Sequence, residues 1–239
     1  MTTTQPEGRL RFPIPRALAA PLIAVGTGLL LWFLLSFLDR EAKALALLLP
    51  RSMAETARLI APVVVEETFK FITIMILVAT SARMRKALPG SPSGAGIGIV
   101  AIVIFSALEN LAYLRAFPGA DVFQRLLWSE PVHLVSALAF AAGLSGSPVY
   151  EEGREPPSKA GRRGRRGAGI ALPFALVWHF AANAIADAGP GPAMVAAVAI
   201  ANFTMIFVLS LLYFDRAMNV DRVLRGPGKA PRPGGSHHG

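Results

Sequence analysis

The stretch VVVEETFKFITIMILV (residues 63–78) has the apolar character of a membrane span, yet Glu66, Glu67 and Lys70 lie inside it. A charged side chain at the centre of a bilayer costs about 2.5–3.5 kcal/mol on insertion scales. Such residues almost always face the interior of a helix bundle or a water-filled cavity, where they pair with one another. The stretch therefore predicts one helix of a membrane bundle with a polar site inside the bundle.

The composition of the whole chain supports this interpretation. Of the 239 residues, 53% are hydrophobic and 16% are charged, whereas soluble domains carry about 25% charged residues. The apolar residues come in blocks of about 20, the length that crosses a hydrocarbon core, and they lack the period-two alternation of a membrane β-barrel. We expect an all-α, polytopic membrane helix bundle of about six to eight helices over residues 17–214. The expected spans are 17–38, 60–80, 94–114, 126–144, 168–187 and 192–214, with a short seventh segment near 44–58 as an option.

The basic residues predict the orientation of this bundle. Seventeen Lys and Arg residues lie in the tails 1–16 and 215–239 and in the loops 81–93 and 145–167, against six on the opposite side. The positive-inside rule then places both termini in the cytoplasm of an integral, multi-pass membrane protein. The net charge of +9 does not indicate nucleic acid, because the basic run KAGRRGRRG has no interleaved aromatic residues to stack on bases. We interpret this run as a loop that contacts lipid headgroups.

Ionisable residues recur in other spans at a similar depth. Glu66 lies near the outer end of the second span, Glu109 near that of the third, His133 near that of the fourth and His179 near that of the fifth. With a rise of 1.5 Å per residue, all four fall roughly 8–12 Å below the outer surface. Unrelated polar substitutions would not agree in depth, so we predict one shared site in the outer half of the bundle.

Spacing and prolines add local detail to this site. Glu66 and Lys70, and likewise His179 and Asn183, are four residues apart and therefore share a helix face. Pro62 is suited to the first turn of a helix, which would place the glutamates near a helix N-terminus. Pro131 is expected to break or begin the fourth helix just before His133.

Four motifs in order resemble a known family. EETFK (residues 66–70) is similar to an E-E-x-x-K motif, FSALEN (105–110) to F-x-x-x-E-N, and HFAAN (179–183) to H-x-x-x-N, with the lone His133 between the last two. This order resembles the PrsW family of bacterial intramembrane proteases, which are relatives of the CAAX prenyl endopeptidases and of the γ-secretase subunit APH-1. The resemblance covers roughly residues 59–190. The CAAX branch differs, because it has E-E-x-x-x-R and a histidine where this chain has Glu109.

The resemblance implies an intramembrane endopeptidase of the bacterial cell membrane. Its substrate would be a single-pass membrane protein, for example an anti-sigma factor, that is cut near the extracytoplasmic side. By motif match Glu66 is the general base and Glu67 its partner, while His179 and Asn183 polarise the carbonyl and hold the oxyanion. Lys70 and Asn110 have supporting roles.

The remaining two residues leave the metal question open. Glu109 and His133 would bind a water molecule or, together with His179, one zinc ion, for which Glu and two His are suitable ligands. An HExxH motif is absent, so these ligands would have to converge from separate helices. A water-activating site that is metal-optional or metal-free is the alternative that we favour.

Two other classes of function use the same residues. A proton- or ion-coupled transporter also needs buried carboxylates and histidines, although such proteins usually contain internal repeats and we find none. A non-catalytic scaffold similar to APH-1 is the other alternative. The absence of cysteine excludes disulfides and thiolate nucleophiles, and Ser106 and Ser136 lack an evident base.

Overall fold

The computed structural model describes residues 16–87, 93–119, 122–145, 159–189 and 191–225, and within them the chain is helical with no strand. The predicted all-α class is therefore confirmed. The six helices are α1 (Arg16–Ala46), α2 (Arg51–Ala87), α3 (Gly94–Ala116), α4 (Val122–Leu144), α5 (Lys159–Asp187) and α6 (Pro192–Arg225).

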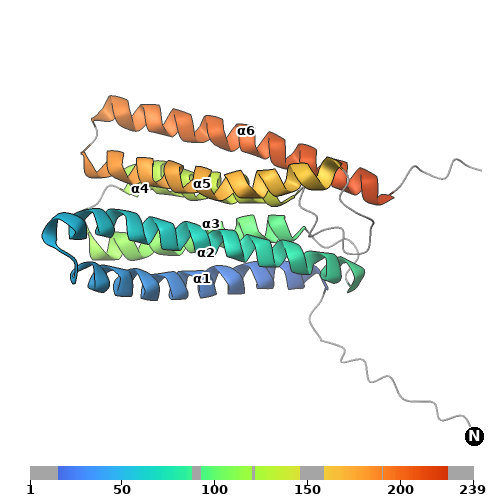
Figure 1. Ribbon diagram of the computed structural model, residues 1–239, viewed down its shortest axis with the longest axis horizontal. Coiled ribbons are helices and arrows are strands. Elements are labelled where there is room, and N and C mark those ends of the chain that lie inside the picture. Colours follow the sequence, from blue (N-terminus) through green and yellow to red (C-terminus); the bar gives the residue numbers. More distant parts are fainter. Residues whose placement is uncertain (1–15, 88–92, 120–121, 146–158, 190, 226–239) are drawn as a thin grey trace, which may run out of the picture.

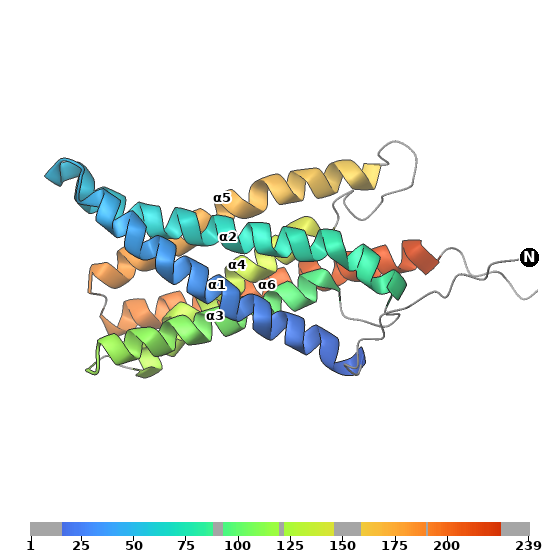
Figure 2. The same ribbon diagram turned by 90° about the horizontal axis from the view of Figure 1, so that it is seen from below.

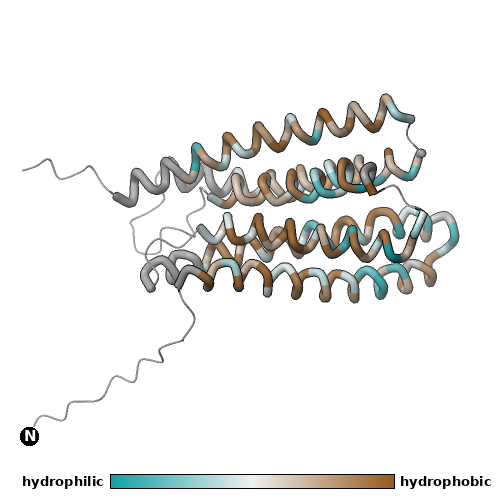
Figure 3. Tube along the Cα trace, turned by 180° about the vertical axis from the view of Figure 1, so that it is seen from behind, coloured by the Kyte–Doolittle hydropathy of each residue, from teal (hydrophilic) through white to brown (hydrophobic). Residues whose placement is uncertain are grey.

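Five of these helices, all but α2, are long and apolar enough to cross a membrane. Helix α2 also runs along the bundle (Figure 1), but it contains the three ionisable residues described above. The helix surfaces are mostly apolar, and hydrophilic residues gather toward the end at which α1 joins α2 (Figure 3). On α6, Phe203, Phe207 and Phe214 are all more than half exposed, as expected of side chains that face lipid. The chain is a multi-pass membrane helix bundle.

The helices stack in layers along the bundle. Helix α1 packs against α2 and α3, α4 packs against α2, α3, α5 and α6, and α2 also contacts α5. Figures 1 and 2 show that α1 begins and α6 ends at the same end of the bundle, as an even number of crossings requires. Helices α1, α3 and α5 end, and α2, α4 and α6 begin, at the opposite end, which we call the connecting end.

Helix α4 forms the centre of the bundle because small residues let its neighbours approach closely. Ala137, Ala141 and Ala142 are buried on it, and a Cβ added to Gly143 would lie 2.9 Å from both the Cβ of Ala171 and the carbonyl oxygen of Gly167 on α5. Small residues at helix contacts are typical of membrane bundles, where packing replaces the hydrophobic driving force.

A second close approach, between α1 and α3, gives a testable prediction. A Cβ at Gly28 would lie 2.7 Å from the carbonyl oxygen of Ala101 and 2.9 Å from the Cβ of Ile104, whereas a Cβ at Gly26 meets nothing within 4 Å. We expect Gly28→Ala to destabilise the protein by about 1–3 kcal/mol through overpacking. Gly26→Ala should be neutral or stabilising by up to about 1 kcal/mol, because alanine favours helix.

Thermal unfolding of both variants in detergent checks this pair. Since the two glycines lie in the same helix, differences in helix propensity cancel in the comparison. Equal stability of the two variants would contradict the close contact between α1 and α3.

Several predicted helix ends differ from the structure. No separate seventh helix occupies residues 44–58, because α1 continues to Ala46 and α2 begins at Arg51. Helix α5 begins at Lys159, inside the predicted basic loop, and α6 extends into the predicted tail as far as Arg225. Lys, Arg and Ala are good helix formers, so these helices continue past their apolar portions. The tail 1–16, except Arg16, and residues 226–239 lie outside the described part of the chain.

The two proline predictions were wrong. Pro62 lies in the middle of α2 and not in its first turn, and α4 continues through Pro131 without a break. A proline removes one helical hydrogen bond, but membrane helices tolerate this because neighbouring groups satisfy the freed carbonyl. Glu66 therefore lies about 22 Å along α2 from the start of that helix at Arg51, too far for the helix dipole to stabilise its charge.

Candidate active site

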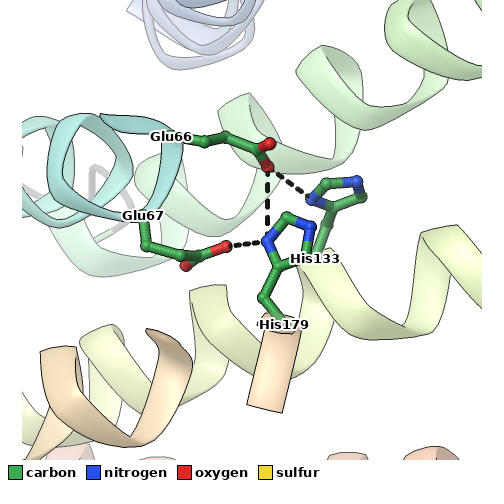
Figure 4. Close-up of side chains that lie close together, drawn as sticks. All are labelled: Glu66, Glu67, His133 and His179. Atoms are coloured by element: carbon green, nitrogen blue, oxygen red, sulfur yellow. Dashed lines mark hydrogen bonds and ion pairs between the residues drawn. The ribbon is translucent and has the colours of Figure 1, made fainter. Parts of the chain in front are cut away.

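Side chains from three helices meet in the interior of the bundle. Glu66 and Glu67 come from α2, His133 from α4 and His179 from α5 (Figure 4). One potential ligand atom from each of the four lies within 4.8 Å of those of the others. Measured along their helices, Glu109, His133 and His179 lie about 10–17 Å from the connecting end, and Glu66 lies about 22 Å from it. For Glu66 and His133 these values exceed the predicted depth of roughly 8–12 Å, because α2 and α4 begin before the expected spans. The predicted convergence is confirmed, because all four residues line one cavity.

Lys70 contacts the carboxylates of both Glu66 and Glu67. Its side chain is fully buried, and its Nζ lies 2.5 Å from Oε1 of Glu66, 2.8 Å from Oε1 of Glu67 and 2.7 Å from Nδ1 of His133. The contacts with Glu67 and His133 are hydrogen bonds, and the contact with Glu66 is an ion pair. The buried amine is thus held at the back of the site by three polar partners.

The donors and acceptors around the two imidazoles define their tautomers. Because Lys70 donates to Nδ1 of His133, the proton of a neutral ring lies on Nε2, which is 2.9 Å from Oε2 of Glu109. His179 is arranged the other way round. Its Nδ1 lies 2.6 Å from Oε1 of Glu67, and because a carboxylate only accepts, Nδ1 carries the proton and Nε2 is left for another partner.

Tryptophans fix the part of α5 that carries His179. The indole N–H of Trp128 on α4 donates to the carbonyl oxygen of Ala182 at 3.2 Å, and that of Trp178 donates to Oδ1 of Asn202 on α6 at 3.0 Å. The rings of His133 and His179 meet edge to face with centroids 5.3 Å apart. These contacts determine how α5 is rotated toward α2 and α4.

A cavity of about 280 Å³ connects the site with the connecting end. Its inner wall contains Glu66, Glu109, His133, His179 and Asn183, whereas Glu67 and Lys70 lie behind that wall. The outer wall adds aromatic and charged side chains from α1, α3 and α4: Trp32, Asp39, Lys43, Tyr113, Arg125 and Trp128.

A second polar network joins α3 to α4 beside the cavity. Arg125 donates from Nε to Oδ1 of Asn110 at 2.7 Å, and Asn110 donates from Nδ2 to Oε1 of Glu130 at 3.0 Å. The Nη2 of Arg125 lies 3.8 Å from Oε1 of Glu109, and its guanidinium lies over the ring of Tyr113 at 4.2 Å. Glu109 thus contacts His133 through one oxygen and Arg125 through the other.

The structure places the predicted residues in two groups. Glu66, Glu67 and Lys70 form the core of the site with His133 and His179. Glu109 joins it at the cavity side of His133. Asn183 lines the cavity one turn after His179, and Asn110 belongs to the network of Arg125.

The predicted metal-ligand set needs correction. The convergent donors are Glu66, Glu67, His133 and His179, whereas the sequence suggested Glu109 with the two histidines. Glu109 approaches His133 from Nε2, while Glu66 is 3.1 Å from Nδ1. The two carboxylates therefore contact opposite nitrogens of one imidazole ring.

Carboxylates and imidazoles are ligands that suit zinc, and their separations fit one ion. With neutral imidazoles, the carboxylates of Glu66 and Glu67 outnumber the ammonium of Lys70 by one charge, since Glu109 is paired with Arg125, and a bound cation would offset that charge. Lys70, however, already binds an oxygen of each α2 carboxylate and would repel a cation there. The four residues can therefore bind a metal ion only if Lys70 gives up part of its contacts with Glu66 and Glu67.

Sequence reasoning missed Arg125 and Glu130 as parts of the site. In the sequence, Arg125 is one of the six basic residues on the side opposite the basic tails and loops. One signal was present: Arg125 and Glu130 flank the start of a predicted span, where unpaired charges would be costly.

No protein-family model, curated protein or solved structure matches the chain. The fold and the site thus define a multi-pass helical membrane protein with a buried Glu/His/Lys cluster on a polar cavity.

Proposed function

We propose that the protein is an intramembrane endopeptidase that uses Glu66 to activate water. The observation that carries the proposal is the convergence of Glu66, His133 and His179 from three helices on one cavity inside a membrane bundle. A carboxylate base, a nearby imidazole and room for water are what peptide hydrolysis requires. The motif resemblance to PrsW-type proteases supports the same class.

The contacts suggest which step of peptide hydrolysis each residue would perform. Glu66 contacts Lys70, His133 and His179 through Oε1, so Oε2 remains for a water molecule in the cavity. Glu66 would take a proton from this water while the resulting hydroxide attacks the carbonyl carbon of the substrate. The same proton would then pass to the leaving amine as the C–N bond breaks.

The oxyanion would form on the side of α5. His179 donates a hydrogen bond from Nδ1 to Glu67, which fixes the ring beside the cavity. The amide of Asn183, which lies one turn further along the cavity wall, would donate to the oxyanion, as would Nε2 of His179 when it carries a proton. Lys70 would keep both glutamates ionised and in place.

The chemistry of the backbone restricts the form of the substrate. In a helix each carbonyl accepts a hydrogen bond from the N–H four residues further along the chain. The substrate would be a membrane-protein segment that has unwound, which frees its carbonyls from helical hydrogen bonds.

A metal-bound form of the site uses the same residues. Glu66, Glu67, His133 and His179 would hold the ion, and zinc would supply a Lewis acid and a metal-activated water. Metal analysis of the purified protein, together with hydrolysis rates before and after chelation, separates this form from the metal-free one.

The position of the cut tests the proposal. The protein would be reconstituted in vesicles with single-pass membrane peptides, and the fragments would be analysed by mass spectrometry. We expect cleavage at or just outside the outer boundary of the peptide's span, because bonds there need less unwinding and the cavity lies toward the connecting end. We propose that this end faces the extracytoplasmic side, because most of the basic residues lie at the other end.

Cleavage on the cytoplasmic side would reject both the orientation and the substrate model. A complete lack of hydrolysis over a broad peptide set would reject the protease and leave a scaffold or a transporter.

A further inference from the structure

We infer that Arg125 is a positioning residue: it holds Glu109 against Nε2 of His133 and so, together with Lys70 at Nδ1, keeps the proton of that imidazole on Nε2. The expected effect of this role on catalysis rests on the proposed function. The effect on the positions of Glu109 and the His133 proton does not.

The first argument is the geometry around Arg125. Its Nε donates to Asn110 at 2.7 Å, its Nη2 lies 3.8 Å from Glu109, and its planar group stacks on Tyr113 at 4.2 Å. A guanidinium presents several donors in a fixed plane, so these three neighbours determine its orientation. Asn110 is itself 3% exposed and bonded at its other end to Glu130. Asn110, which orients the guanidinium, is therefore held by hydrogen bonds on both sides of its amide group.

The second argument concerns Glu109, which would otherwise be mobile. Its side chain is 35% exposed, the most exposed carboxylate in contact with the histidines, compared with 15% for Glu66 and 0% for Glu67. A partly exposed Glu has several rotamers and loses their entropy when it is held in one. Arg125 opposes rotation toward water, because it attracts Oε1 while Oε2 lies 2.9 Å from Nε2 of His133.

The position of Glu109 also affects Lys70, because both residues contact the imidazole of His133. As long as the carboxylate of Glu109 lies 2.9 Å from Nε2 and favours a proton there, Nδ1 of His133 has a lone pair and accepts an N–H of Lys70 at 2.7 Å. If Glu109 turns away, the proton of a neutral ring can also lie on Nδ1, and Lys70 then loses that acceptor. Arg125 at the cavity wall is thus linked through Glu109 and His133 to the amine behind the site.

The test uses nitrogen NMR of histidine-labelled full-length protein in detergent or lipid. The chain has only four histidines, two of which are the adjacent tail residues His237 and His238; spectra of His133→Gln and His179→Gln assign the other two. In the wild type we expect His133 to show a protonated Nε2 and an unprotonated Nδ1. In Arg125→Met, which keeps the stem over Tyr113, we expect a mixture of tautomers at His133.

Two further variants serve as controls. Arg115→Gln removes an exposed arginine on α3 and should leave the His133 spectrum unchanged. Arg125→Lys keeps the positive charge but lacks the planar guanidinium with its several donors. Its His133 spectrum should therefore lie between those of the wild type and of Arg125→Met. It also serves as the test variant if Arg125→Met does not fold. A wild-type His133 spectrum in whichever of the two variants folds overturns the inference.

Kinetics separate positioning from substrate binding. If the protein hydrolyses a peptide, Arg125→Met should lower kcat on the order of 10- to 100-fold, the effect of removing groups that orient a histidine, with little change in KM. A raised KM with an unaltered His133 spectrum would mean that Arg125 binds substrate, which overturns the inference. If no peptide is hydrolysed, the proposed function fails, while the NMR comparison still decides the role of Arg125.

Discussion

Glu66→Gln should lower peptide hydrolysis by on the order of 100- to 10,000-fold, the range associated with loss of a general base. Glutamine keeps the shape of the side chain but cannot take the proton of a water. The fold should survive, because Lys70 retains Glu67 as a partner at 2.8 Å. The measurement is single-turnover cleavage in vesicles, together with thermal unfolding to show that the variant is folded.

Glu55→Gln is the matched control for this variant. Glu55 lies on the same helix, but its side chain is exposed, so the substitution should leave the rate within about twofold of the wild type. Normal cleavage by folded Glu66→Gln would exclude Glu66 as the base. Loss of cleavage in both variants would indicate a general defect of α2.

Lys70→Met should destabilise the protein by about 3–5 kcal/mol, the usual cost of removing one partner from a buried ion pair. The buried amine contacts Glu66 and Glu67, and without it two adjacent carboxylates would repel each other away from bulk water. Thermal or denaturant unfolding in detergent measures the effect.

Lys43→Met provides the comparison at the surface. Lys43 forms an ion pair with Asp39 at 2.6 Å with the same spacing of four residues, but their side chains are 58% and 38% exposed. Exposed pairs contribute about 0–1 kcal/mol, so Lys43→Met should have little effect on stability.

A double variant tests the reason for the Lys70 effect. Lys70→Met combined with Glu67→Gln removes one positive and one negative charge, and we expect it to recover part of the stability that Lys70→Met loses. If Lys70→Met alone were as stable as Lys43→Met, Lys70 would not be the counter-ion of the glutamates.

The amino-acid sequence by itself determined the class of fold. Apolar blocks of about 20 residues specify membrane helices, and all six expected spans are helical in the structure. The sequence also located the site, because ionisable residues are tolerated in such spans only when they face the interior. The pairing of Glu66 with Lys70 followed from their spacing of four residues on one helix. The assignment of catalytic roles remains a prediction.

The sequence misjudged where several helices begin and end. Pro62 and Pro131 seemed to mark helix boundaries, yet both lie inside helices. In a bundle the neighbouring helices and the lack of competing water keep the backbone helical across a proline. Local rules for soluble helices therefore fail at these two residues.

Only the tertiary structure decided how residues from different helices meet. Sequence spacing relates side chains within one helix, whereas the rotation of each helix about its axis depends on close contacts such as that between Gly143 and Ala171. This rotation places Nδ1 of His133 2.7 Å from Nζ of Lys70, a residue 63 positions away in the sequence. It also directs Glu109 to the opposite nitrogen of the same ring and places Arg125 beside Glu109. The sequence thus determined which polar groups enter the membrane, and helix packing determined which of their atoms are in contact.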